Sequence, residues 1–381
     1  MVAAVESAML AGLQDIGRAR RIVVKIGSAL LIESGTPRRE WLSSMAGDLA
    51  ALRERGAQVI VVSSGAIALG AARLALPKGG RANLADAQAA AAVGQIELAD
   101  LWSGALREHG ITAAQMLLTL DDLEDRRRYL NASATLDRLL SAGTIPVINE
   151  NDSVATEEIR FGDNDRLAAR VAQAASADVV LLLSDVDGLY TCDPREAGAE
   201  LVPVVDAITP EVMAMASSAS SSGLGSGGMR SKLQAAQIAT RAGIALGIIT
   251  GKAEAPISAA LTAGRGTLFL AHRGEGARKA WLGGRLAPAG ELRVDKGCAE
   301  ALRGGASLLA PGIVGVSGQF RRGDLVSIVS MKGERLAQGL AEYDAAEVQL
   351  IAGRRAEDQA ERLGYAPRAA VIHRDHLVLL S

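Results

Sequence analysis

Between residues 21 and 271, short apolar runs rich in Val, Ile and Leu alternate with longer Ala- and Leu-rich stretches that have helical spacing. This alternation is typical of right-handed βαβ units, which form one parallel sheet with helices on both faces. The sequence therefore predicts an α/β fold for this part of the chain. The expected strands lie at residues 21–26, 58–62, 114–118, 145–148, 178–183, 244–250 and 267–271, and the expected helices at about 42–56, 84–108, 126–140, 166–175, 233–242 and 253–263.

The strand expected at residues 145–148 runs directly into a group of acids and amides. Four of them follow the strand and three more begin the helix expected from residue 166: Asn149, Glu150, Asn151, Asp152, Asp163, Asn164 and Asp165. Ligands of open α/β sheets bind at the carboxyl ends of the strands. A strand-end turn or a helix cap would explain either group alone, but not both. We interpret the two groups as a binding site for a small ligand with a positive charge.

Two other strands carry features of an anion site. Lys25 lies inside the strand at 21–26, where a charged side chain needs a partner or a ligand unless the strand lies at a sheet edge. The strand at 58–62 ends in Ser63-Ser64-Gly65-Ala66, a turn of small residues at a helix start. Backbone N–H groups in such a turn can cradle an anion. An edge-strand lysine remains the alternative for Lys25.

Residues 216–228 form a low-complexity stretch of Ser, Gly and Ala, and Lys232 follows it at the start of the next expected helix. The stretch contains a GxGxxG pattern at Gly223, Gly225 and Gly228, but no strand precedes it, so the match to a dinucleotide site is weak. No Walker A pattern occurs in the chain. A flexible linker is one interpretation, and a mobile phosphate-binding lid fits the glycines better.

Composition restricts the class of protein further. The net charge of −2 gives no global reason to bind nucleic acid or an anionic membrane. Cys192 and Cys298 have no CxxC or histidine spacing, which favours a reducing compartment and argues against a structural metal. No apolar run is long enough to span a membrane, and residues 1–19 lack the basic start of a signal peptide. We expect a cytoplasmic protein with no membrane partner.

A break in composition near residues 272–289 separates a second module from the α/β part. Beyond the break, short β-like runs at 291–294, 307–309, 325–329, 336–340 and 370–373 are separated by glycine turns, which predicts a compact, mostly β module. Its basic residues are diluted by acids, which favours a solvated surface over an RNA-binding patch. We expect an N-terminal extension (1–20), an α/β domain (21–272), a linker (273–289), a mostly β domain (290–367) and a C-terminal tail (368–381).

These motifs together resemble the glutamate 5-kinase family, whose members phosphorylate glutamate in the first step of proline synthesis. The resemblance rests on Val23–Ser28, Val62–Ile67, Gln115–Thr119, Val147–Asp152, Gly162–Asp165, Gly188–Tyr190 and Gly223–Met229. Residues from about 290 to 367 resemble a PUA domain, a module known from RNA-modifying enzymes. The resemblance implies the amino-acid-kinase fold, a three-layer αβα sandwich around a mainly parallel central sheet, joined to a small, mostly β PUA-like domain.

The resemblance also implies roles for individual residues. Lys25 and Lys232 would hold the transferring phosphoryl group, and Asp165 would orient the two lysines. Glutamate would be bound by Ser64, Gly65, Ala66, Asp152 and Asn164. ATP would be bound by Lys25, Gly27, Ser28, Ser184, Asp185, Ser226, Gly227, Gly228, Met229, Arg230, Ser231 and Lys232. ATP and Mg²⁺ are the implied cofactors, with no protein ligand assigned to the metal. Inhibition by proline, a homo-oligomeric state and an RNA contact through the PUA-like domain are further implications.

The chemistry of such a reaction agrees with these residue types. A carboxylate is already anionic at neutral pH, so its phosphorylation needs no general base. Two lysines that converge on one phosphate repel each other, and an acid such as Asp165 is expected between them. The carboxylates of glutamate need donors such as Asn164 and the backbone at Ser64–Ala66. Its free α-ammonium needs an acceptor such as Asp152, which argues against acetylglutamate kinase, because the substrate of that enzyme is N-acylated. An RNA-binding protein that acts through the PUA-like domain is the alternative from another class.

Overall fold

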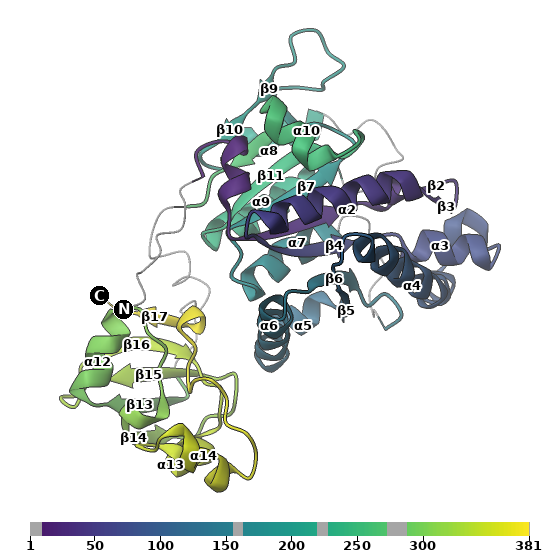
Figure 1. Cartoon of the computed structure of the whole chain (residues 1–381). Coiled ribbons are helices and arrows are strands. Elements are labelled where there is room, and N and C mark those ends of the chain that lie inside the picture. The colour runs from purple at the N-terminus through teal and green to yellow at the C-terminus, as the bar shows by residue number, and fades with distance from the viewer. Residues whose placement is uncertain (1–9, 155–162, 219–227, 273–287, 381) are drawn as a thin grey trace. The chain divides into compact units, whose positions relative to one another are not determined.

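Figure 1 shows the chain as a computed structural model, which describes residues 10–154, 163–218, 228–272 and 288–380. Contacts divide the chain into two compact units. The larger unit holds the described residues of 7–124 and 131–273, and the smaller unit holds those of 274–381 together with 125–130. The domain boundaries expected from the sequence stay a prediction. No helix among the described residues has both the length and the apolar character needed to cross a membrane.

The larger unit is built on an eight-stranded sheet with the order β10-β12-β11-β7-β1-β4-β6-β5. Its strands are β1 (Arg21–Ile26), β4 (Gln58–Ser63), β5 (Ala113–Leu118), β6 (Ile145–Glu150), β7 (Val179–Ser184), β10 (Val204–Val205), β11 (Ala245–Thr250) and β12 (Thr267–Phe269). All neighbouring strands are parallel except β11 and β12. The mainly parallel sheet predicted from the alternating sequence pattern is therefore confirmed. Two small hairpins, β2 (Ile32–Glu33) with β3 (Thr36–Pro37) and β8 (Leu189–Tyr190) with β9 (Leu201–Val202), lie outside it.

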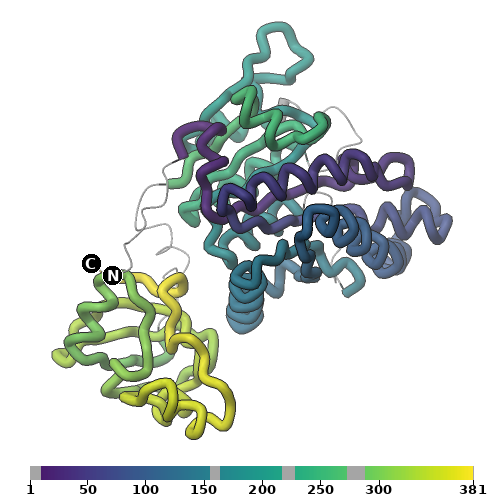
Figure 2. The backbone as a smooth tube through the Cα atoms, viewed as in Figure 1, coloured from purple at the N-terminus to yellow at the C-terminus, as the bar shows by residue number. Residues whose placement is uncertain are grey.

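Helices flank this sheet in the larger unit. They are η1 (Leu13–Arg18), α1 (Ser28–Leu31), α2 (Arg39–Glu54), α3 (Ala66–Arg73), η2 (Pro77–Gly80), α4 (Leu84–Arg107), α5 (Leu120–Glu124), α6 (Arg126–Ser141, whose first turn belongs to the smaller unit), α7 (Asp163–Ala174), α8 (Pro210–Ser218), α9 (Met229–Arg241) and α10 (Pro256–Ala263). Helix α2 packs against α4 and α10, and α7 packs against α9. Helix α4 packs along α3, as the backbone tube of Figure 2 shows. The predicted α/β sandwich is thus confirmed. The start of α3 was predicted, after the turn that ends at Ala66, but its extent was not, and helices α1, α5 and α8 were not predicted. Helices α3 and α8 hold mainly Ala, Gly, Met and Ser, which give little helical periodicity.

The side chains of strand β1 alternate between the two faces of the sheet, and both faces are buried. Its residues Ile22, Val24 and Ile26 join a buried core that includes Leu42 and Met45 of α2. Because side chains alternate along a strand, Lys25 points to the opposite face. The lysine of β1 is therefore not an edge residue: β1 lies between β4 and β7, with Lys25 paired in register with Val62 and Leu182.

The smaller unit has a sheet and a core of its own. Its five-stranded sheet has the order β14-β13-β15-β16-β17, with β13 (Gly290–Val294), β14 (Ile313–Gly318), β15 (Leu325–Val329), β16 (Arg335–Leu340) and β17 (Leu377–Leu379). Helices α12 (Lys296–Arg303), α13 (Ala345–Ile351) and α14 (Ala356–Leu363) and the short turns η3 (Ala310–Gly312) and η4 (Arg374–His376) complete it. The predicted β character is confirmed. The runs expected at 307–309 and 370–373 form no strands and meet only in a single bridge, Leu308 to Ile372. Strands β14 and β17 and the three helices were not predicted.

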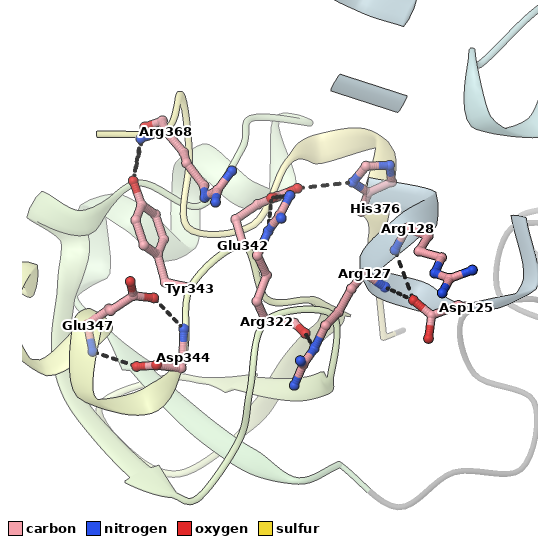
Figure 3. Close-up of polar contacts among 10 residues, drawn as sticks. All are labelled: Asp125, Arg127, Arg128, Arg322, Glu342, Tyr343, Asp344, Glu347, Arg368 and His376. Carbon is pink, nitrogen blue, oxygen red and sulfur yellow. Dashed lines mark hydrogen bonds and ion pairs between the residues drawn. The ribbon is translucent and has the colours of Figure 1, made fainter. Parts of the chain in front are cut away.

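Partly buried polar contacts hold the loops of the smaller unit (Figure 3). Glu342 accepts a hydrogen bond of 3.3 Å from Nη2 of Arg322 and lies 3.8 Å from Nδ1 of His376. Burial would raise the pKa of Glu342, but His376 and Arg322 together hold it below its usual value. Asp344 and Glu347 form a reciprocal capping box at the start of α13. These contacts order the segments around β16 and β17.

Candidate active site

A buried acid lies between two buried lysines in the larger unit. Nζ of Lys25 lies 2.6 Å from Oδ1 of Asp165, and Nζ of Lys232 lies 3.2 Å from Oδ2 of the same carboxylate. The exposed fraction is 0% for Asp165, 8% for Lys25 and 6% for Lys232. Burial alone would raise the pKa of Asp165, but the two lysines outweigh it and hold the pKa below its ordinary value. Asp165 is therefore an anion at neutral pH, balanced by two cations.

Three elements distant in the sequence supply these side chains. Lys25 comes from β1, Asp165 from the first turn of α7, and Lys232 from the first turn of α9. The packing of α7 against α9 and against β1 brings them together. Ser231, also from α9, has its Oγ 3.5 Å from Oδ2 of Asp165. The residues proposed for phosphoryl transfer thus form one cluster, and Ser231 of the expected ATP loop lies beside it.

A row of amide side chains begins next to this cluster. Nδ2 of Asn164 donates to Oγ of Ser64 at 2.5 Å and to Oδ1 of Asn149 at 3.3 Å. Nδ2 of Asn149 in turn donates to Oε1 of Gln95 at 2.9 Å. The oxygen Oδ1 of Asn164 is buried and has no hydrogen-bond partner among the described residues. The row therefore presents an unused acceptor beside Asp165.

Helix α4 supports the turn at Ser64–Ala66 through a hydrogen bond to the preceding residue, Ser63. Nε1 of Trp102 donates to Oγ of Ser63 at 2.9 Å, and both side chains are buried. Gly65 has φ of +127°, a conformation that favours glycine, and it caps α3. A Cβ there would also stand 2.7 Å from Cδ1 of Ile32. The turn is therefore rigid, and a side chain at position 65 would have little room.

The carboxyl end of β6 adds a second buried acid. Asp152 is 9% exposed. Burial lowers the pKa of Arg81, which follows η2, and the charge of Asp152 acts in the opposite direction, so the two charges lie near each other. Sequence reasoning missed Arg81, Gln95 and Trp102, and it placed Asn149 in the predicted site only as one of several polar residues after the strand. The one local sequence signal that could have drawn attention to Gln95 is that Gly94 and Gln95 interrupt an alanine-rich helix.

The residues proposed for ATP lie at neighbouring strand ends. Gly27 and Ser28 follow β1. Ser184 ends β7, the neighbour of β1 in the sheet, and Asp185 follows it. Oγ of Ser184 donates to Oδ1 of Asp185 at 3.1 Å. Gly228 caps α9, whose first turn holds Met229 to Lys232. Ser226 and Gly227 lie outside the described residues. Within the described ranges, no group of three His, Cys, Asp or Glu side chains could hold a metal ion.

Comparisons with known proteins identify the family of this chain. The model of the amino acid kinase family matches residues 20–250, and the model of the PUA domain matches residues 290–363. Glutamate 5-kinase from Novosphingobium aromaticivorans is 62% identical over 372 residues, which cover 97% of this chain and 99% of that protein. Glutamate 5-kinase from Sphingopyxis alaskensis is 59% identical over 361 residues, covering 94% of this chain and 97% of the relative. Glutamate 5-kinase from Zymomonas mobilis is 55% identical over 362 residues, which cover 94% of this chain and 91% of that protein.

Proposed function

Because the chain belongs to the amino acid kinase family, and within it to the glutamate 5-kinases, we propose that it transfers the γ-phosphoryl group of ATP to the γ-carboxylate of L-glutamate. The observation that carries this proposal is the buried Lys25–Asp165–Lys232 cluster. The product would be L-glutamyl 5-phosphate, formed in the first step of proline synthesis. We place the reaction in the cytoplasm, where reducing conditions suit the free thiols Cys192 and Cys298.

The reaction needs charge stabilisation more than proton transfer. An oxygen of the γ-carboxylate attacks the γ-phosphorus, and the bond from that phosphorus to the bridging oxygen breaks, so ADP leaves with the electron pair. The nucleophile has no proton to lose, which suits a site without a general base. Lys25 and Lys232 would balance the charge that develops on the phosphoryl oxygens. Asp165 would hold both ammonium groups in place before the phosphates arrive.

The glutamate contacts follow from the polarity of the other side chains. The hydroxyl of Ser64 accepts from Asn164, so its own proton can turn toward a substrate carboxylate. The backbone N–H groups of Gly65 and Ala66 open α3 and suit an anion. Asp152 and Oδ1 of Asn164 are acceptors for the α-ammonium. An N-acylated substrate has no such charge, which disfavours acetylglutamate kinase activity.

ATP would bind across the ends of β1 and β7 and the first turn of α9. Mg²⁺ would enter with ATP, held by phosphate oxygens and water, because it prefers oxygen ligands and keeps several waters. Proline carries the same ammonium and carboxylate pair as the backbone of glutamate, so we propose that it competes at this site. Assembly into homo-oligomers and an RNA contact through the PUA-like domain stay predictions from the resemblance.

The direct test is ADP release by the purified full chain with MgATP and one acceptor at a time. We expect turnover with L-glutamate and at least tenfold lower kcat/KM with L-aspartate and N-acetyl-L-glutamate, since each misplaces or removes a recognised group. Preference for either analogue would contradict the proposal.

A further inference from the structure

The amide row that ends at Asn164 has a polarity, and that polarity decides what Asn164 offers to a ligand. An amide side chain carries an acceptor oxygen and a donor nitrogen, and every hydrogen bond needs one of each. A row of amides therefore has only two self-consistent orientations, related by turning all of its members together. Gln95 stands at one end of this row and the ligand site at the other.

In the structure, the row has the orientation in which Gln95 accepts. Oε1 of Gln95 accepts from Asn149, and Oδ1 of Asn149 accepts from Asn164. Both N–H groups of Asn164 are engaged, one by Asn149 and one by Ser64. Asn164 has no donor left for a ligand, and its buried Oδ1 has no partner in the described part of the chain. The amide thus offers an acceptor.

The reversed orientation would change the chemistry of the site. Gln95 would donate to Asn149, Asn149 would donate to Asn164, and the Ser64 hydroxyl would donate to Asn164 as well. Asn164 would then present an N–H group, which suits a carboxylate or an acyl oxygen but repels an ammonium. The two orientations therefore favour ligands of opposite polarity.

The structure holds Gln95 in a position where it can determine the orientation of the amide row. Its neighbour Gly94 lies against the start of α3, where an added Cβ would stand 1.8 Å from the carbonyl oxygen of Ala66. This close approach fixes the part of α4 that carries Gln95. Asn149, between Gln95 and Asn164, is 3% exposed, so its amide cannot exchange a lost partner for bulk water. Gln95 itself is partly exposed, and its remaining N–H groups can donate to solvent.

We propose that Gln95 is a positioning residue: by accepting from Asn149, it keeps the amide of Asn164 turned so that Oδ1 receives the α-ammonium of the amino-acid substrate. This inference rests on the proposed glutamate kinase activity. Gln95 does not touch the substrate, and its effect passes through Asn149 and Asn164.

The test compares two substitutions of Gln95 that differ in hydrogen bonding. Gln95→Glu supplies only acceptors, so it keeps the present orientation, and we expect a KM for L-glutamate within about threefold of the wild type. Gln95→Met removes the acceptor at similar size, and we expect that KM to rise on the order of tenfold, the usual effect of one lost hydrogen bond. The KM for ATP and kcat should change less than about threefold in both variants. If the Gln95→Met variant does not fold, Gln95→Ala replaces it as the variant without an acceptor.

A double variant separates a positioning role from a merely structural one. If Gln95 acts through Asn164, then Gln95→Met should add nothing to the KM of Asn164→Ala. Additive effects, or a Gln95→Glu variant as impaired as Gln95→Met, would overturn the proposal. Failure of the wild-type chain to use L-glutamate would instead overturn the proposed function, so the two failures are distinguishable.

Discussion

Gly94 in α4 lies in direct backbone contact with Ala66 at the start of α3: an added Cβ on Gly94 would stand 1.8 Å from the carbonyl oxygen of Ala66. Gly70 makes the reciprocal approach, with its added Cβ 1.8 Å from the carbonyl oxygen of Ala90. The two helices can cross so closely only because both positions lack a side chain. This crossing holds the Ser64–Ala66 turn and Gln95 in one rigid arrangement.

Gly94→Ala should therefore destabilise the protein and weaken glutamate binding together. Overpacking of this kind costs about 1–3 kcal/mol, and α3 must move away from α4 to admit the methyl group. The matched control is Gly104→Ala in the same helix, where an added Cβ meets no atom within 4 Å. That control should be neutral or more stable by about 0.5–1 kcal/mol, because alanine favours the helix. Chemical denaturation and the KM for glutamate measure both effects. Equal stability of the two variants would contradict the close crossing.

Lys25→Ala and Lys232→Ala should lower kcat far more than they raise the KM for glutamate. A charge contact that forms mainly in the transition state typically contributes on the order of 10²–10³-fold in rate. The control is Lys332→Ala, an exposed lysine of the smaller unit, which should leave kcat unchanged. Steady-state kinetics with both substrates varied would check this. An unchanged kcat with a raised KM for ATP would reduce the two lysines to anchors for bound ATP.

Asp165→Asn should lower stability in a pH-dependent way. Removing this charge leaves two buried lysines without their counterion, a loss of about 3–5 kcal/mol. The pKa of Asp165 is lowered in the folded state, so its contribution is complete above the ordinary value of 3.8 and is lost as pH falls through the lower folded value. Urea titrations of both proteins should show a constant difference in unfolding free energy from neutral pH down to about the ordinary pKa of 3.8. Below that pH the difference should become smaller. A gap that closes between pH 7 and 5 would contradict this assignment.

Asp152→Ala should raise the KM for glutamate and the inhibition constant for proline in parallel, because both ligands present an ammonium to the same carboxylate. Inhibition of the wild type by proline should be competitive with glutamate. Initial rates over a grid of glutamate and proline concentrations would show both effects. Proline inhibition that persists unchanged in the variant would place its site elsewhere.

The sequence predicted the parts of the molecule whose signals are local. The apolar run of β1 marked a strand, and the acids and amides at and beyond the carboxyl end of β6 marked a candidate site. The family resemblance joined Lys25, Asp165 and Lys232 into one site. Gln95 and Trp102 could not be found in this way. Gln95 lies in the middle of α4 and Trp102 nearer its end, and only the packing of this helix brings them to Asn149 and Ser63. Their roles depend on contacts between segments, which spacing along one chain does not encode.

The central claim is that a free amino-acid carboxylate is phosphorylated, and trapping the product tests it most directly. The full chain would be incubated with MgATP, L-glutamate and hydroxylamine, which converts an acyl phosphate into a stable hydroxamate. Chromatography against authentic standards then identifies which carboxylate reacted. We predict L-glutamate γ-hydroxamate, formed in equal amount to ADP. Formation of the α-hydroxamate, or release of ADP without any hydroxamate, would contradict the claim.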